Sequence, residues 1–405
     1  MQTKISQQYL NTPHGQEADS ILRKCVHCGF CTATCPTYQL LGDELDSPRG
    51  RIYLIKQLFE GNAVSEKTQN HLDRCLTCRA CETTCPSGVQ YGRLVDLGRD
   101  LVEDKVKRPV NQRLLRYALR KFVPYPKRFS LLLKLGHFFK PLLPVAIKQK
   151  LPPLPKARPR PVDTHARRIL VVEGCAQRVV TPQTNAAVAR VLDKLGIQLI
   201  STPEDGCCGA LSHHAAANEE ALTFIRRNID AWWPYVEQGV EAILSTASGC
   251  GVVIKDYGHL LKEDTQYAEK AKRISVLTKD ISEVLAGEDL SEMSFKPKYE
   301  KVAFHSPCTL QHGQKLNGVV ETILSTVGYS LTRVTDAHLC CGSAGAYSIL
   351  QPDLSQQLLN NKLVSLQQGQ PDVIASANIG CQMHMTTQAK VPVKHWIELL
   401  DEAWL

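Results

Sequence analysis

The second half of the chain alternates between short apolar runs and longer stretches in which apolar residues recur every three or four positions. Runs that begin at Arg167 ("RRILVVEGC"), Ile197 ("IQLISTPEDGCCG") and Ala242 ("AILSTASGCG") are predicted to be strands that run up to a cysteine, the second of them into a double cysteine. Between them, residues 184–196 and 218–233 have the spacing of amphipathic helices. Strands that alternate with helices in this way predict α/β units built on parallel sheets.

The same succession of elements occurs a second time. Strand-like runs start at Lys301 ("KVAFHSPC"), Tyr329 ("YSLTRVTDAHLCCG", which runs into a second double cysteine) and Asp372 ("DVIASANIGC"), and helical spacing covers residues 319–328 and 355–369. Cysteines occupy matching positions 133 residues apart, or 131 in the last pair: Cys175 and Cys308, Cys207 and Cys340, Cys208 and Cys341, and Cys250 and Cys381. This regularity indicates an internal duplication.

The N-terminal part of the chain is predicted to be helical. Residues 47–61 begin with Ser47, a favoured N-cap residue, continue with Pro48 at the first helical position, and end at Gly61. Residues 68–75 then carry helical spacing up to Cys75. With 405 residues the chain is long enough for two or three domains, each with its own core.

The positive charge is confined to one segment. The net charge is +8, but 16 Lys and Arg and no Asp or Glu lie between Lys105 and Arg160, so the rest of the chain is acidic. Because Leu and Phe alternate with these cations and Pro interrupts them, we expect short helices that lie on an anionic membrane surface. A docking surface for an acidic partner and a nucleic-acid site are the alternatives. Residues 152–161 ("PPLPKARPRP") predict a stiff linker.

The sequence contains no membrane span and no secretory signal that we can identify. No apolar run approaches the roughly 20 residues that a spanning helix needs, and the first 20 residues have no apolar core of a signal peptide. The 16 cysteines of such a chain point to metal binding rather than to disulfides.

Eight of the cysteines form two runs with the pattern C-x2-C-x2-C-x3-C-P. This pattern is typical of proteins with two [4Fe–4S] clusters, in which the fourth cysteine of each run binds the other cluster; structural zinc and unmetallated thiols are the alternatives. One cluster is therefore expected on Cys25, Cys28, Cys31 and Cys85, and the other on Cys75, Cys78, Cys81 and Cys35.

The other eight cysteines follow predicted strands of the duplicated half. Binding residues of open α/β sheets gather beyond the carboxyl ends of the strands. We therefore expect at least one further iron–sulfur cluster here, with ligands from Cys175, Cys207, Cys208, Cys250, Cys308, Cys340, Cys341 and Cys381.

Both halves resemble known families. The N-terminal runs and the helix between them resemble the α-helical ferredoxin domain of the succinate dehydrogenase and heterodisulfide reductase families. The pattern C-x31-CCG resembles the cysteine-rich CCG domain of heterodisulfide reductase, whose motif ends in C-x2-C. Here Val253 and His384 stand where that motif has its fifth cysteine. Either four cysteines per repeat hold a cluster, or the two repeats share one, or His384 acts as a substitute ligand.

The resemblance predicts an α+β multidomain protein. The expected parts are an α-helical ferredoxin domain over residues 1–103, the basic segment and linker over 104–163, and two tandem α/β CCG repeats over 164–290 and 291–405. Near the first run, His27 is expected to be a loop residue, and Arg49 and Arg51 either offset cluster charge or lie on a solvated helix face. His213 and His214 are expected to be ordinary polar residues at a helix start.

The whole arrangement resembles the iron–sulfur subunit family of bacterial glycolate oxidase. The resemblance implies a complex with two flavin-type subunits that oxidises glycolate, and D-lactate as well, and passes electrons toward a quinone-type acceptor. It also implies a peripheral position on the cytoplasmic face of the inner membrane. No G-x-G-x-x-G opens a βαβ unit and no catalytic constellation is evident, so FAD and substrate oxidation are assigned to the partners.

Three alternatives remain for the function. The architecture is also that of the iron–sulfur subunit of the anaerobic glycerol-3-phosphate dehydrogenase. The CCG cysteines are compatible with a disulfide reductase, although the missing fifth cysteines count against it. A regulator that senses oxygen or iron would need a DNA-binding element, for which the basic segment is the candidate.

Overall fold

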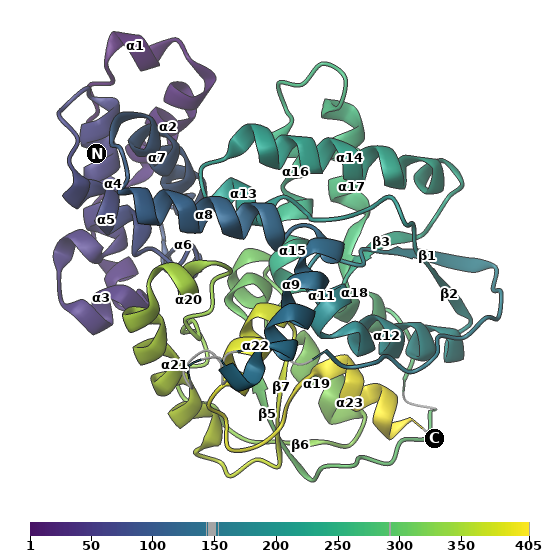
Figure 1. The fold of residues 1–405 in the computed structure, drawn as a ribbon. Helices are drawn as coiled ribbons and strands as arrows, with labels where there is room; N and C mark the ends of the chain where they lie inside the picture. The colour runs from purple at the N-terminus through teal and green to yellow at the C-terminus, as the bar shows by residue number, and fades with distance from the viewer. Residues whose placement is uncertain (143, 145–150, 153, 291–292, 405) are drawn as a thin grey trace. The chain divides into compact units, whose positions relative to one another are not determined.

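Helices make up the N-terminal part of the chain, as its apolar spacing predicts. The computed structural model describes residues 1–142, 144, 151–152, 154–290 and 293–404. The elements up to residue 142 are α1 (Gln7–Leu10), α2 (Pro13–Lys24), η1 (Phe30–Thr32), α3 (Pro36–Leu41), η2 (Glu44–Asp46), α4 (Pro48–Phe59), α5 (Glu66–Asp73), α6 (Ala80–Thr84), α7 (Tyr91–Lys105), α8 (Val110–Phe122), α9 (Pro126–Phe138) and η3 (Lys140–Leu142) (Figure 1).

Among the described residues, the chain forms two compact units. The first unit comprises residues 1–116 with 214–216 and 338–362. The second unit comprises residues 117–213, 217–337 and 363–405. The segment 338–362, which carries the double cysteine of the second repeat, therefore belongs to the first unit together with the N-terminal cysteine runs.

Helix α4 anchors the first unit. The Ser47 hydroxyl accepts a hydrogen bond from the backbone N–H of Gly50 at 2.9 Å, and Pro48 is the first helical residue, which confirms the predicted start. Gly61 follows the helix with a φ of +86°, a conformation that glycine adopts without strain. The buried face of α4, with Ile55 and Leu58, packs on α7 and forms the core of this unit.

Two parallel sheets in the second unit confirm the predicted α/β units, within the part of the chain that is described. The first sheet has the order β2-β1-β3-β4 and the second β6-β5-β7-β8. The strands are β1 (Arg167–Val171), β2 (Ile197–Ile200), β3 (Ala242–Ser245), β4 (Thr278–Asp280), β5 (Lys301–His305), β6 (Ser330–Leu331), β7 (Val373–Ser376) and β8 (Val393–His395).

Helices connect the parallel strands. Those of the first repeat are α11 (Gln177–Val180), α12 (Pro182–Lys194), α13 (Ala210–His214), α14 (Asn218–Glu237), α15 (Ser248–Lys255), α16 (Tyr257–Leu260), α17 (Ala268–Leu277) and α18 (Ile281–Leu285). The second repeat has a π-helical turn, η4 (Thr309–Gly313), and α19 (Val319–Thr326), α20 (Tyr347–Leu350), α21 (Pro352–Gln367), α22 (Ile379–Thr386) and α23 (Trp396–Ala403).

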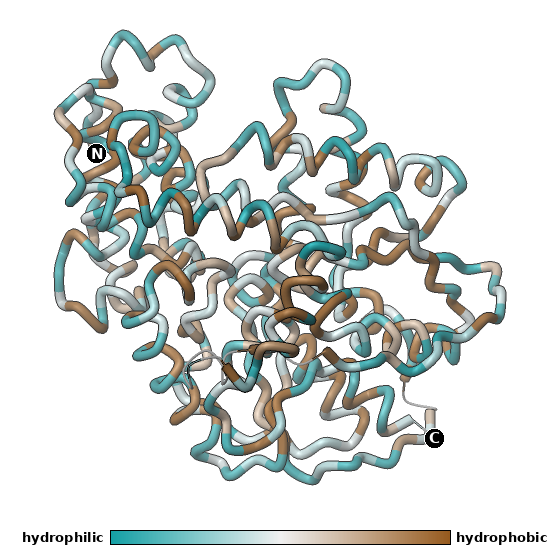
Figure 2. Tube along the Cα trace, in the orientation of Figure 1, coloured by the Kyte–Doolittle hydropathy of each residue, from teal (hydrophilic) through white to brown (hydrophobic). Residues whose placement is uncertain are grey.

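The two repeats share one hydrophobic core. Buried residues of the first sheet and α12, such as Ile169 and Val188, belong to the same cluster as Val302 of β5 and Trp396 of α23. Helices α12 and α23 are in direct contact. Hydrophobic stretches follow the strands of both sheets (Figure 2). The two repeats therefore pack against each other through a continuous core.

Some elements differ from the sequence-based expectation. The strands expected to run into the double cysteines end earlier, at Ile200 and Leu331, and a loop leads from each to the CC pair. The short edge strands β4 and β8 were not predicted, because three residues give too little alternation. His213 and His214 lie at the end of the short helix α13, not at a helix start.

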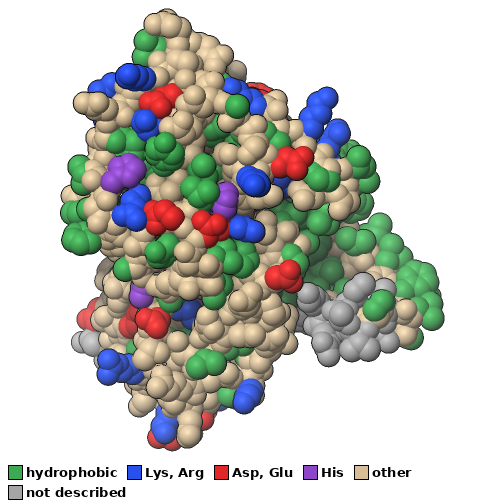
Figure 3. Space-filling view, turned by 90° about the vertical axis from the view of Figure 1, so that its left-hand side faces the viewer, with side chains coloured by type: hydrophobic (Ala, Val, Ile, Leu, Met, Phe, Trp, Pro, Cys, Tyr) green, Lys and Arg blue, Asp and Glu red, His purple; other side chains and the backbone are tan. Residues whose placement is uncertain are grey.

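The basic segment forms α8, α9 and η3. The rest of that segment includes residues 143, 145–150 and 153, which lie outside the described residues. Residues 291–292, near the expected start of the second repeat, also lie outside them. Every helix within the described ranges is too short or too polar to span a bilayer. On the face drawn in Figure 3, hydrophobic side chains lie among charged side chains of both signs.

Candidate iron–sulfur sites

Three cysteines of the first run and the last cysteine of the second line one pocket. Cys25, Cys28, Cys31 and Cys85 surround a space of about 430 Å³, which includes its open mouth. The loop that carries Cys25, Cys28 and Cys31 bends at His27, whose φ is +57°. This is the ligand set that the crossed pattern predicts for one cluster.

The complementary four cysteines line a second pocket. Cys35, from the first run, lies with Cys75, Cys78 and Cys81 around a space of about 290 Å³. Thr77 donates its backbone N–H to the Cys75 sulfur at 3.4 Å. Such N–H to sulfur bonds orient a thiolate and lower its negative charge when it binds a metal.

Tyr91 and Cys81 line both pockets. The Tyr91 side chain is buried, and its hydroxyl donates to the Cys75 sulfur at 3.5 Å. The two pockets are therefore separated by no more than the side chains that they share. Sequence reasoning missed Tyr91, which lies five residues after the second run and carries no motif of its own.

The thiols of each pocket lie close together, and Cys25, Cys35, Cys75 and Cys81 are buried. Burial, followed by the charges of the neighbouring Cys25 and Cys28, raises the pKa of Cys31 to about 11. Burial also raises the pKa of Cys81 well above its usual range, with further contributions from Cys78 and Cys75. Crowded thiolates of this kind are unfavourable without a cation, and iron supplies the positive charge that offsets them. The residues present thus fit two iron–sulfur clusters.

Two arginines differ in their relation to the pockets. Arg51 is 1% exposed and forms an ion pair with the fully buried Asp46, Nη2 to Oδ1, at 3.2 Å. Both terminal nitrogens of Arg51 also lie 3.2 Å from the Thr37 hydroxyl, which in turn is 3.3 Å from the Cys35 sulfur. Arg51 is therefore a buried cation beside the second pocket, and not part of a solvated face. Arg49 is partly exposed, lines the first pocket and pairs with Glu44 at 2.7 Å.

The cysteines of the first repeat form a chain of thiol contacts. Cys175 and Cys208 both act on the pKa of Cys207, and Cys250 acts on that of Cys208, so the four thiols are close neighbours. Cys175 follows β1, the double cysteine follows β2, and Cys250 lies in the first turn of α15, after β3. All four sulfurs thus meet at the carboxyl edge of the sheet, where the strand order reverses. They fit a metal cluster that takes four thiolates.

The double cysteine is held from behind by buried polar groups. Asn228 donates its side-chain N–H to the Cys207 carbonyl at 2.8 Å, and the Tyr257 hydroxyl donates to the Cys208 carbonyl at 2.8 Å. Gly209 follows with a φ of +90°, and a Cβ atom there would lie 3.1 Å from the Ala221 carbonyl oxygen. The CCG sequence therefore requires glycine for both its conformation and its packing.

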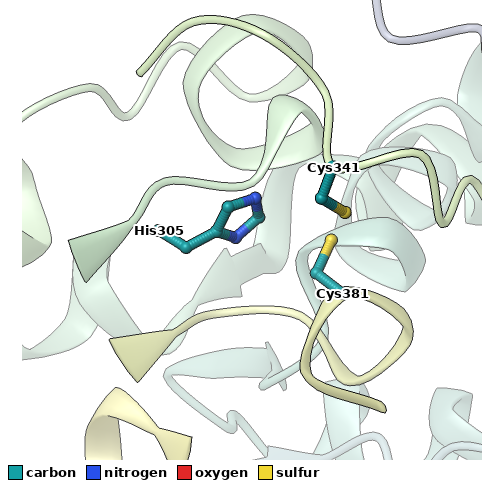
Figure 4. Close-up of side chains that lie close together, drawn as sticks. All are labelled: His305, Cys341 and Cys381. Carbon is teal, nitrogen blue, oxygen red and sulfur yellow. The ribbon is translucent and has the colours of Figure 1, made fainter. Parts of the chain in front are cut away.

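The cysteines of the second repeat have equivalent positions along the chain. Cys308 follows β5 and Cys381 lies in the first turn of α22, and both are buried in the second unit. Cys340 and Cys341 are buried in the first unit, where a Cβ atom on Gly342 would lie 2.6 Å from the Ser355 carbonyl oxygen. Figure 4 draws Cys341, Cys381 and His305.

His305 was not among the sequence-based candidates. It is 2% exposed at the end of β5 and offers a ring nitrogen within 4.8 Å of the Cys381 sulfur. Within a run of apolar residues a single histidine carries little signal, although its place three residues before Cys308 was visible. His384, which the sequence offered as a substitute ligand, lies in the last turn of α22.

Tyr347 lies between the two kinds of cysteine motif within the first unit. Its side chain is buried, and its hydroxyl donates to the carbonyl of Arg74, the residue before Cys75, at 3.2 Å. Burial raises its pKa above the usual range, and the neighbouring charges that act on it include those of Cys75 and Cys340. One side chain thus connects the second N-terminal run with the double cysteine of the second repeat.

Comparison with known proteins agrees with this arrangement. Residues 21–89 match the 4Fe-4S dicluster domain family, and residues 169–255 and 302–386 match the Cysteine-rich domain family. The chain is 56% identical to the glycolate oxidase iron-sulfur subunit of Escherichia coli (strain K12), over 100% of this chain and 99% of that protein. It is 30% identical to the probable glycolate oxidase iron-sulfur subunit of Bacillus subtilis (strain 168), over 94% of each. Lactate utilization protein A of Bacillus velezensis is 26% identical over 54% of this chain and 93% of its own length.

Proposed function

The chain belongs to the family of glycolate oxidase iron–sulfur subunits, and on this premise we propose that it relays electrons within a complex that oxidises glycolate. Its iron–sulfur character and its electron-transfer role follow from the family. We assign the oxidation of glycolate, and of D-lactate as a second substrate, to two flavin-containing partner subunits, with a quinone-type compound as the acceptor. Full-length similarity to the Escherichia coli protein is the observation that carries the proposal.

The chemistry of the chain supports this division of labour. Oxidation of a 2-hydroxy acid removes two electrons, whereas iron–sulfur clusters, when bound, accept and release electrons singly. The sites described above are lined mainly by thiols with buried polar support, and we assign no proton transfer from a hydroxy acid to their residues. The substrate step is therefore assigned to a cofactor on another subunit.

For the N-terminal clusters we keep the two ligand sets that the sequence pattern predicts. We propose one [4Fe–4S] cluster on Cys25, Cys28, Cys31 and Cys85, and a second on Cys75, Cys78, Cys81 and Cys35. The sequence predicts at least one further cluster on the CCG cysteines, and of the arrangements that it leaves open we adopt one cluster in each repeat. The two pockets, each lined by one of the predicted sets, support the crossed assignment. The chain of thiol contacts from Cys175 to Cys250 supports a cluster in the first repeat.

The relay has a route between the halves of the chain. Tyr91 lines both N-terminal pockets, so electrons cross a short protein gap there. Tyr347 lies beside the second run and the Cys340 motif, which supports exchange between that run and the second repeat. The expected domain boundaries at residues 103, 163 and 290 remain part of this proposal.

Helix α9 supports a peripheral position on a membrane. Leu131, Leu135 and Phe138 recur at helical spacing and are 59%, 47% and 77% exposed, while Leu133 is buried and fixes the opposite side. Four exposed cations accompany them: Lys127, Arg128, Lys134 and Lys140. We call these seven exposed residues the α9 surface. Apolar side chains flanked by cations suit an anionic leaflet, and we propose the cytoplasmic face of the inner membrane as its site.

Lactate is the second candidate substrate of the complex. Similarity to lactate utilization protein A favours it, although this similarity covers about half of the chain. Purification of the full-length protein with its bound partners, followed by assays with glycolate, D-lactate, glycerol 3-phosphate and a heterodisulfide, tests the proposal. Reduction of the chain's clusters by glycolate through flavin-containing partners is expected. Reduction by glycerol 3-phosphate or by none of these substrates would contradict it.

A further inference from the structure

His305 is a buried imidazole at the carboxyl edge of the second sheet. Its Nδ1 atom lies 3.0 Å from the hydroxyl of Ser376, which is its register partner on the neighbouring strand β7. A ring nitrogen of His305 and the sulfur of Cys381 lie within 4.8 Å of each other (Figure 4). Both residues are at most 4% exposed. A nitrogen donor and a thiol are therefore brought together at one end of parallel strands, where the corresponding thiols of the first repeat meet.

The first repeat has no counterpart of this histidine. The position 133 residues before His305 is Val172, which is buried and apolar. At the position of the missing fifth cysteine, the first repeat has the buried Val253. At the positions that match between the repeats, the first repeat therefore offers a metal only its four thiols. The second repeat adds the imidazole of His305. The duplication keeps the strands and the cysteines but changes the donor set.

We propose that His305 is a nitrogen ligand of the iron–sulfur cluster in the second repeat. Imidazole is a common ligand of iron, and it replaces cysteine in some iron–sulfur centres. The Ser376 hydroxyl at Nδ1 fixes the orientation of the ring, as outer-shell partners of metal-bound histidines do. The assignment gives Nε2 to the metal and rests on the proposed presence of a cluster in the second repeat.

The proposal gives the two repeats different electronic properties. A neutral imidazole carries one negative charge less than a thiolate, and replacement of thiolate by histidine raises the reduction potential of a cluster. The second repeat is therefore the stronger electron acceptor of the two. His384 follows Cys381 by three residues in α22. The proposal assigns the nitrogen ligand to His305, whose ring nitrogen lies within 4.8 Å of the Cys381 sulfur.

The test is isotopic and does not depend on activity. Full-length protein is produced with ¹⁵N-histidine, purified anaerobically, poised at stepped potentials and measured by pulsed electron paramagnetic resonance. We expect a strong ¹⁵N hyperfine coupling on one cluster signal. The coupling should disappear in His305→Val, which introduces the residue of the first repeat, and persist in the control variants His312→Ala and His384→Ala.

Two further outcomes keep the proposal separate from the proposed function. If iron analysis shows clusters in the CCG repeats but the wild-type protein has no ¹⁵N coupling, or if the coupling survives in His305→Val, the histidine assignment is wrong and the relay stands. If these repeats bind no iron, both fail. Because His305→Val could also unfold the protein, His305→Cys serves as a second variant, which should retain its iron, lose the coupling and shift to a lower midpoint potential. An unchanged coupling in His305→Cys would overturn the proposal.

Discussion

At the scale of single residues, the second N-terminal pocket depends on a buried ionic group. Asp46 is fully buried and contacts Arg51, Arg74 at 2.8 Å and His71 at 3.0 Å. Removal of one partner from such a group leaves a charge in a low-dielectric region without full compensation. Arg51 also adds positive charge beside Cys35 and Cys75, where a cluster with thiolate ligands is negative.

Arg51→Met should therefore have two effects. Loss of the buried pair should lower the free energy of unfolding by about 3 kcal/mol. Loss of a buried cation should also lower the midpoint potential of one [4Fe–4S] cluster, because the reduced state carries more negative charge. Chemical denaturation and a redox titration monitored by paramagnetic resonance measure these effects. Arg49→Met removes a partly exposed arginine at the first pocket and is the matched control. It should leave the potential of the cluster on Cys75, Cys78, Cys81 and Cys35 unchanged.

Crossed ligation is tested with the last cysteine of the second run. Cys85→Ala should perturb the cluster on Cys25, Cys28 and Cys31, because Cys85 lines their pocket. Cys35→Ala should affect the other cluster in the same way. Spectra of the two variants distinguish the clusters. Selective loss of the Cys75–Cys81 cluster in Cys85→Ala would refute the crossed assignment.

At the scale of elements, α8 and α9 use their cations differently. In α8, Arg116 pairs with Asp73 at 3.1 Å and Arg120 pairs with Glu220 at 3.0 Å, so these charges serve the fold. In α9, the cations and the apolar stripe are exposed together. Some cations of the basic segment therefore form ion pairs within the protein, and others lie on the α9 surface. The sequence alone did not distinguish the two groups.

Vesicle sedimentation tests the α9 surface. Each basic residue close to an anionic leaflet contributes about 1 kcal/mol at low salt, so replacement of Lys127, Arg128, Lys134 and Lys140 by Gln should weaken binding to phosphatidylglycerol vesicles at least tenfold. The pair Leu131→Ser and Phe138→Ser should weaken binding at high salt as well. A different result would contradict this assignment. If the wild-type protein does not bind anionic vesicles, and the α9 variants no longer co-purify with their partner subunits, the α9 surface binds protein instead.

Local signals predicted most elements of the fold. Ser47, Pro48 and Gly61 define α4, Gly196 marks the end of α12, and apolar runs with helices between them predicted the parallel strands. The edge strands β4 and β8 were not predicted, because three residues are too few to show the alternation of a strand. The short strand β6 and the loop after it were predicted as one long strand, because apolar residues recur in the sequence after Leu331. In the structure the strand ends at Leu331.

At the scale of the whole molecule, the spacing of cysteines predicted the candidate sites better than it predicted what surrounds them. Each N-terminal set was assignable because four ligands recur in a fixed pattern. Asp46, Tyr91, His305 and Tyr347 were not, because their roles arise from burial and from contacts between distant segments. A histidine inside a strand or a tyrosine in a short helix acquires its surroundings only when the chain folds.

The central claim is that both halves of the chain hold iron–sulfur clusters. Quantification of iron and acid-labile sulfide in the anaerobic full-length protein tests it most directly. Two [4Fe–4S] clusters supply roughly eight iron atoms per chain, so clusters in the CCG repeats should bring the value clearly above this. In a variant with Cys208→Ala and Cys341→Ala it should fall toward eight. A wild-type value of about eight that these substitutions leave unchanged would contradict the account.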